Sequence, residues 1–200
     1  MKLQLYTFIS KTEYVNPRLL TIVLFCFLTG ITTGVFNEIQ LSADARESME
    51  DFLNSSVLSA GFNGEGLPAL FLKSAAANGG LFLIILLAGV TIIGFPAALL
   101  VLAYKGAALG FASTLLIDTL SAKGILLVAL KLLPPNIFLI PALCGASAAS
   151  FKFGLSILSG GRRNIKKNLT GRSGHYLIFQ AFMGVLILAG CLVESLISLL

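Results

Sequence analysis

The sequence contains no tryptophan, a single histidine and three cysteines, and only 12% of its 200 residues are charged. Cys26, Cys144 and Cys191 lie far apart inside apolar runs, so no Cys-x-x-Cys pair is present for zinc or redox chemistry. We expect them to be small buried apolar residues. No Gly-x-Ser-x-Gly, His-Glu-x-x-His or Walker loop occurs either. We therefore expect a protein that is not an enzyme and that holds no metal or cofactor.

Apolar residues, in contrast, make up 56% of the chain, which is more than a soluble domain of this length could bury in one core. The stretch 79–159 is almost uninterrupted apolar sequence. We expect a single membrane domain that covers residues 1–200 and contacts the lipid bilayer. The net charge of +5 does not indicate nucleic-acid binding, because no basic face interleaved with aromatic residues accompanies it.

The pattern of apolar runs predicts an all-α fold with five transmembrane helices and one re-entrant or interfacial half-helix. A hydrocarbon core of about 30 Å is crossed by about 20 helical residues. The predicted spans are 19–36, 79–104, 106–122, 136–159 and 175–200, and the half-helix is 124–135. We expect Pro96 to kink the second span and Pro134 with Pro135 to end the half-helix. Asn136 is expected to be the N-cap of the fourth span.

Two connections of opposite charge predict the orientation. Residues 37–78 form an acidic loop with six acidic and two basic residues, and its middle is expected to form a helix that begins after Ser42. Residues 160–174 form a basic loop, and basic loops stay in the cytoplasm. We therefore expect a multi-pass protein of the cell membrane with residues 1–18 in the cytoplasm. The acidic loop and the C-terminus would be extracytoplasmic.

Few charged residues lie within or beside the predicted spans. Lys105 is expected to end the second span and to reach the inner membrane surface, and Glu194 is expected to reach the outer surface. Asp118 leaves two interpretations open. It is either an interfacial acid that caps a helix or pairs with Lys123, or it lines a polar cavity within the membrane.

Small residues mark two faces that are suited to close helix packing. One lies in the outer half of the first span and consists of Thr29, Gly30, Thr32, Thr33 and Gly34. The other has a Gly-x-x-x-Gly spacing, from Gly106 to Gly110. The first face fits packing inside the bundle or against a span of another protein, and both possibilities stay open.

Several short motifs follow one another in order. They are a helix break with Gly and Pro, a Lys-Gly pair, a Gly-Phe pair, a second Lys-Gly pair, and Leu-Pro-x-Asn followed by Pro. The residues are Gly94, Pro96, Lys105, Gly106, Gly110, Phe111, Lys123, Gly124, Leu133, Pro134, Asn136 and Pro141. In this order they resemble the core of the stage II sporulation protein M family. The resemblance extends over about residues 19–200 and is strongest in 89–145.

The resemblance implies a non-enzymatic scaffold in the septal, engulfing membrane of the mother cell. It would recruit peptidoglycan hydrolases for septal thinning and engulfment of the forespore during sporulation. The implied partners are the membrane-anchored stage II sporulation proteins D and P, and a homo-oligomer is left open. The alternative is a small transporter or channel. Its polar path would include Asp118 and Lys131 and would run around the broken helices.

Overall fold

A computed structural model describes residues 17–49, 51, 66–91, 95–159 and 161–199. These residues form helices and short connections without any strand, and five helices are long and apolar enough to cross a membrane. The fold is an all-α polytopic membrane protein, which confirms the prediction. In chain order the helices are α2 (Pro17–Ile39), α4 (Leu67–Val90), α5 (Phe95–Leu120), α6 (Ala122–Leu127), the π-helix η1 (Val128–Leu132), α7 (Leu133–Ser159) and α8 (Gly161–Ser198).

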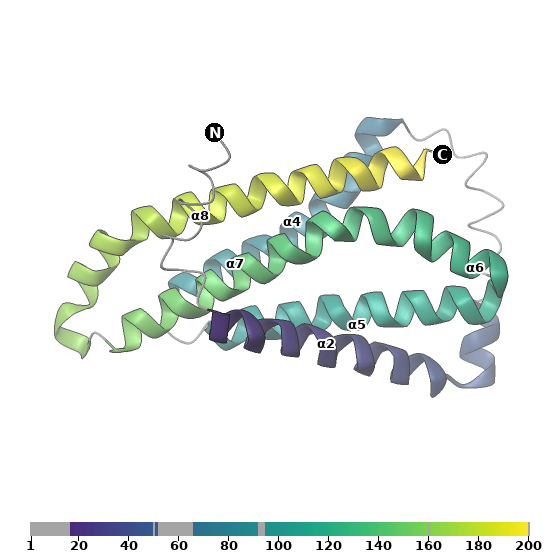
Figure 1. The fold of residues 1–200 in the computed structure, drawn as a ribbon, viewed down its shortest axis with the longest axis horizontal. Coiled ribbons are helices and arrows are strands. Elements are labelled where there is room, and N and C mark those ends of the chain that lie inside the picture. Colours follow the sequence, from purple (N-terminus) through teal and green to yellow (C-terminus); the bar gives the residue numbers. More distant parts are fainter. Residues whose placement is uncertain (1–16, 50, 52–65, 92–94, 160, 200) are drawn as a thin grey trace.

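The helices form an elongated bundle in which α2 lies along α5 and α7 lies along α8 (Figure 1). Helix α4 contacts α5, α7 and α8 and so connects the two pairs. Side chains from the five long helices meet in the apolar core, which includes Phe27, Ile85, Leu102, Leu143 and Ile187. Cys144 and Cys191 are buried in this core, as expected, whereas Cys26 is only half-buried. All three are free thiols.

The boundary between the second and third spans differs from the prediction. The second span is α4, which begins at Leu67, and the third is α5, which begins at Phe95. The predicted span 79–104 therefore joins parts of two helices, and residues 67–78 belong to the membrane bundle rather than to the acidic loop. Pro96 lies in the first turn of α5 and does not kink a helix, because a first-turn residue needs no backbone donor. Gly94 lies outside the described residues.

The half-helix does not end at the two prolines, so that prediction is wrong. Residues 122–159 are helical throughout, as α6, η1 and α7 in succession, and 122–155 is one candidate span. The π-helix comes directly before Pro134 and Pro135, which cannot donate backbone hydrogen bonds to the preceding turn. A widened turn at this point lets the helix continue where a regular α-helix would break.

Asn136 consequently lies inside a helix and is not an N-cap. Its amide nitrogen donates to the carbonyl oxygen of Leu132 at 2.7 Å, one turn earlier. The Asn136 side chain is buried, and its oxygen has no hydrogen-bond partner among the described residues. The residue therefore stabilises the junction between η1 and α7 by bonding back into the widened turn.

The first span is longer than predicted, because α2 covers Pro17–Ile39 in place of 19–36. The last candidate span, Gly174–Ser198, agrees with the predicted 175–200, although the helix α8 itself begins earlier, at Gly161. The basic run from 162 to 172 is therefore the start of a long helix rather than a loop. Residues 43–49 form a short helix after Ser42, as expected. Predictions for residues 1–16 and 52–65 fall outside the described part of the chain. The outer end of the bundle is the end where α2 ends and α4 begins.

Candidate functional sites in the membrane bundle

Helices α2 and α5 pack through glycines on both sides of their interface. A methyl group on any of four glycines would collide with a backbone carbonyl of the facing helix. The contacts are Gly30 on Ala103, Gly34 on Ala107, Gly106 on Phe27 and Gly110 on Ile31. The predicted Gly-x-x-x-Gly face of α5 thus meets a matching Gly-x-x-x-Gly face of α2. The two backbones approach more closely than side chains would allow, which gives a rigid helix pair.

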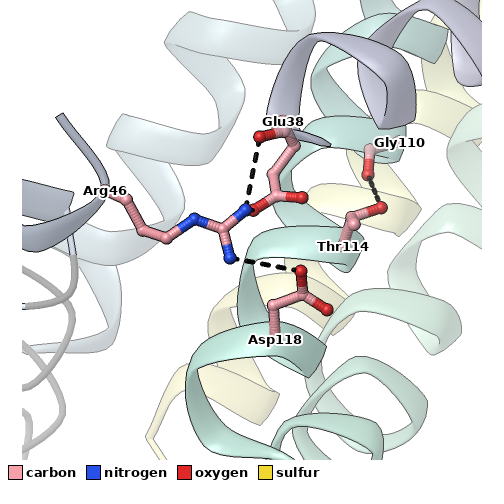
Figure 2. A network of polar contacts seen from close by, with 5 residues as sticks. All are labelled: Glu38, Arg46, Gly110, Thr114 and Asp118. Atoms are coloured by element: carbon pink, nitrogen blue, oxygen red, sulfur yellow. Dashed lines mark hydrogen bonds and ion pairs between the residues drawn. The ribbon is translucent and has the colours of Figure 1, made fainter. Parts of the chain in front are cut away.

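An ion-pair cluster ties the outer helix at 43–49 to this pair (Figure 2). The Arg46 guanidinium lies 2.8 Å from Oε1 of Glu38 at the end of α2, and 3.4 Å from Oδ2 of Asp118 near the end of α5. The Glu38 side chain is fully buried, whereas 44% of the Asp118 side chain is exposed. Asp118 therefore pairs with Arg46, and the predicted pair with Lys123 is wrong.

The Glu38 carboxylate is the most constrained member of this cluster. Its Oε2 atom has no hydrogen-bond partner among the described residues. Arg46 also approaches the Glu38 backbone oxygen at 3.5 Å, so one guanidinium nitrogen contacts this residue twice. A protein that buries a carboxylate with a single cationic partner is strongly destabilised when that partner is removed. Arg46 is therefore the residue that stabilises the buried Glu38 carboxylate.

A second polar chain crosses the bundle between α4, α5 and α8. Lys105 Nζ donates to Asn78 Oδ1 at 2.8 Å, and Asn78 Nδ2 donates to Glu194 Oε2 at 3.1 Å. The Ser74 hydroxyl donates to the same Glu194 oxygen at 2.6 Å. Lys105 is thus a half-buried residue inside α5 rather than a lysine at the inner surface. The expectation for Lys105 is therefore wrong. Glu194 lies near the outer end of α8 and is bound there by Ser74 and Asn78.

A third cluster stabilises α7 and α8 against α4. The hydroxyl groups of Tyr176 and Ser150 are 2.9 Å apart, and Gln180 Nε2 donates to the Ser150 oxygen at 2.9 Å. All three side chains are buried. Further bonds reach backbone oxygens: Ser150 to Ile85, Tyr176 to Leu86 and Gln180 to Ala146. These bonds satisfy polar groups in the bundle interior, where an unpaired group is costly, but Gln180 Oε1 has no partner among the described residues.

The turn between α5 and α6 explains another motif pair. Ser121 has a positive φ of 49°. Gly124 packs so closely against Leu116 that a methyl group at position 124 would collide with the Leu116 carbonyl oxygen. Lys123 is exposed beside it. The Lys-Gly motif at this position therefore allows a tight reversal of the chain, with glycine as the residue that sterics require.

The proposed polar path through Asp118 and Lys131 does not assemble among the described residues. Both side chains are exposed, and Asp118 is paired with Arg46. Phe111 is half-buried in α5, and Pro141 is an exposed residue inside α7. The intramembrane polar groups that do come together are those around Asn78, whose position inside a helix the sequence reading missed.

The residues that the sequence reading missed are mostly polar residues on different helices. The sequence pattern predicts a loop at Asn78, and it predicts that Glu38 and Arg46 are charges of that loop. A signal was present in Tyr176 and Gln180, which are one turn apart in an otherwise apolar run. In the described part of the chain no three His, Cys, Asp or Glu side chains gather where they could hold a metal ion.

The fold and these clusters define a polytopic all-α membrane protein whose polar residues connect helices. The sequence model described as stage II sporulation protein M matches residues 23–199, which is most of the chain. The chain therefore belongs to the stage II sporulation protein M family, as the motif order predicted, and it is a multi-pass sporulation membrane protein. Comparisons with curated proteins and with solved structures find no match.

Proposed function

We propose that this chain is a non-enzymatic scaffold that recruits membrane-anchored peptidoglycan hydrolases for septal thinning and engulfment of the forespore. The expected partners are the stage II sporulation proteins D and P, in the septal membrane of the mother cell. Family membership supports the sporulation role. The polar clusters support a structural role, because each of them binds helices to one another.

The observation that carries the proposal is a groove on the membrane-facing side of the α2–α5 pair. It has a volume of about 260 Å³ and is lined by Thr29, Gly30, Thr33, Ala103, Tyr104 and Ala107. The Tyr104 side chain is 66% exposed at its rim. Tyr104 is nine residues into α5, about 14 Å from the inner end of that helix at 1.5 Å per residue. The groove therefore lies at the depth of the lipid hydrocarbon.

The polar groups of this groove suit a transmembrane helix better than lipid. The Tyr104 hydroxyl makes no hydrogen bond with any residue that the structure describes. The Thr29 and Thr33 hydroxyls donate to carbonyl oxygens of their own helix at 2.8 Å, so their oxygens are still able to accept. A polar group facing hydrocarbon without a partner is unfavourable. A partner span that brings a carbonyl or hydroxyl to Tyr104 would remove that cost and fill the groove.

Site-specific photocrosslinking in sporulating cells tests this assignment. A photoreactive phenylalanine analogue at Tyr104 is expected to capture the transmembrane segment of a wall hydrolase. The matched control places the same analogue at Val185 of α8, which is 64% exposed on an apolar stretch outside the groove. Equal capture of the hydrolase from both positions would contradict the groove as the docking face. Capture of a second copy of this chain from Tyr104 alone would replace the partner with a homo-oligomer.

A transporter is the second candidate, because the Lys105–Asn78–Glu194 chain places charged groups inside the bundle. The two proposals separate on Lys105→Met, measured beside Tyr104→Leu at the groove. Transport requires loss of sporulation with Lys105→Met, in a variant that still inserts and melts cooperatively. Scaffolding requires the loss with Tyr104→Leu instead. Sporulation that survives Tyr104→Leu but not Lys105→Met would overturn the scaffold proposal.

A further inference from the structure

A hollow of about 290 Å³ lies between α4 and α8 at the outer end of the bundle. Its lining includes Leu70 near the start of α4 and Ser198 at the end of α8. Leu70 and Lys73 lie three and six residues after the start of α4, about 5 and 9 Å from its outer end at 1.5 Å per residue. The headgroup region of a bilayer is about 5–8 Å thick on each side. The hollow is therefore at the depth where lipid headgroups meet the hydrocarbon.

The Glu194 carboxylate faces this hollow with one oxygen fixed and the other available. Oε2 accepts hydrogen bonds from Ser74 and Asn78, at 2.6 and 3.1 Å. Asn78 is held in this orientation because its own oxygen accepts from Lys105. Oε1 accepts no hydrogen bond from the described residues, and Glu194 lines the hollow. The bundle thus presents a preoriented carboxylate oxygen to whatever enters.

We infer that this hollow binds the headgroup of a zwitterionic phospholipid with a primary amine, the phosphoethanolamine group. The ammonium would donate to Oε1 of Glu194, and such charge-assisted bonds are the strong ones. Leu70 and Ala77 supply apolar contacts for the start of the acyl chains. This role is independent of the scaffold proposal, because α4 and α8 do not line the groove at Tyr104.

The chemistry predicts a preference among lipids of similar size. Phosphatidylcholine is also zwitterionic but its quaternary ammonium has no N–H to donate, and phosphatidylglycerol has no amine. Hydrogen bonds to charged groups contribute about 1.5–3 kcal/mol, so we expect phosphatidylethanolamine to be enriched about tenfold or more over phosphatidylcholine. The preference should disappear when Glu194 loses its charge.

The test is native mass spectrometry of the purified full chain after equilibration with equimolar phosphatidylethanolamine, phosphatidylcholine and phosphatidylglycerol of identical acyl chains. The wild type should retain the ethanolamine lipid selectively, Glu194→Gln should lose the selectivity, and Asp118→Asn should keep it. Asp118 is the matched control, since it is an acid at the same end of the bundle, paired with Arg46 outside the hollow. Equal retention of the three lipids by the wild type, or unchanged selectivity in Glu194→Gln, would overturn the inference.

Two further experiments, a variant that fills the hollow and a competition with free ethanolamine, test the same inference. Ala77→Phe fills the hollow without removing any of the polar contacts, so it should also abolish selectivity if Glu194→Gln proves unfolded. Free ethanolamine, added at millimolar concentration, should not displace the lipid. Displacement by free ethanolamine together with equal binding of the two zwitterionic lipids would assign the site to a soluble amine and overturn the lipid assignment.

Discussion

Gly34 and Gly110 lie where two helix backbones touch, and alanine at either position would place a methyl group on a facing carbonyl. Overpacking of this kind costs about 1–3 kcal/mol. We expect Gly34→Ala and Gly110→Ala to lower the melting temperature of the detergent-purified protein and to loosen α2 from α5. Melting with a thiol-reactive dye or by circular dichroism measures the effect.

The control for this prediction is Gly79→Ala in α4. Gly79 has open space around its α carbon and lies in a membrane helix, so alanine there should be neutral or slightly stabilising. If all three variants melt at the same temperature, the close packing of α2 on α5 is wrong.

Two tyrosines make a matched pair for a second prediction. The Tyr176 hydroxyl is buried and bonded to Ser150 and to a carbonyl oxygen, whereas the Tyr104 hydroxyl is exposed without a bond to the described residues. Tyr176→Phe should therefore destabilise the isolated protein by about 1 kcal/mol, and Tyr104→Phe should leave its stability unchanged. Reversible unfolding in denaturing detergent compares them. A larger loss from Tyr104→Phe in the isolated chain would show that its hydroxyl has a partner within the bundle.

Close packing between helices could be predicted from the sequence, but polar contacts between helices could not. Residues that pack by size alone, such as the glycines at 106 and 110, were identified by their spacing. Asn78, Glu38 and Arg46 were not identified, because their importance comes from partners on other helices. Apolar periodicity carries no information about which polar groups meet across a bundle, so these contacts required the three-dimensional arrangement.

Among the elements, the short helix at 43–49 is held to the membrane bundle by Arg46. Removal of this guanidinium leaves the buried Glu38 without a cation, which costs about 3 kcal/mol or more. Arg46→Gln should therefore destabilise the protein clearly and should make the outer helix accessible to protease. Asp118→Asn is expected to cost less than about 1 kcal/mol, because that pair is partly exposed and 3.4 Å long.

A double-mutant cycle with Glu38→Gln and Arg46→Gln checks the assignment. The double variant should be more stable than Arg46→Gln alone, since the uncompensated charge is gone. Additive effects of the two substitutions would mean that the two side chains do not interact in the membrane-embedded protein.

The span boundaries also belong to the scale of elements. The number of spans and the helical class followed from hydropathy, but two boundaries did not. The polar residues Lys73 and Asn78 are typical of a loop, and Lys105 is typical of a helix end. The bundle nevertheless pairs the polar groups of Asn78 and Lys105 internally. Likewise, Pro134 and Pro135 predict the end of a helix, because the rule that proline ends a helix takes no account of a preceding π-helical turn.

As a whole molecule, the helix bundle offers distinct faces to its surroundings. The α2–α5 pair carries the groove at hydrocarbon depth, and the outer end carries the helix anchored by Arg46 and the hollow at Glu194. The order of short motifs was sufficient to assign the family, because that order survives even where the predicted boundaries of the spans were wrong. The partner, in contrast, is not encoded in any single motif.

The most direct test of the scaffold proposal is affinity purification of the tagged full chain from sporulating cells in mild detergent, followed by quantitative mass spectrometry. The account predicts recovery of peptidoglycan hydrolases at near-stoichiometric levels, and loss of that recovery in Tyr104→Leu but not in the lipid-facing variant Val185→Ala. A purified chain that carries no hydrolase in several detergents, while wild-type cells complete engulfment, would contradict it.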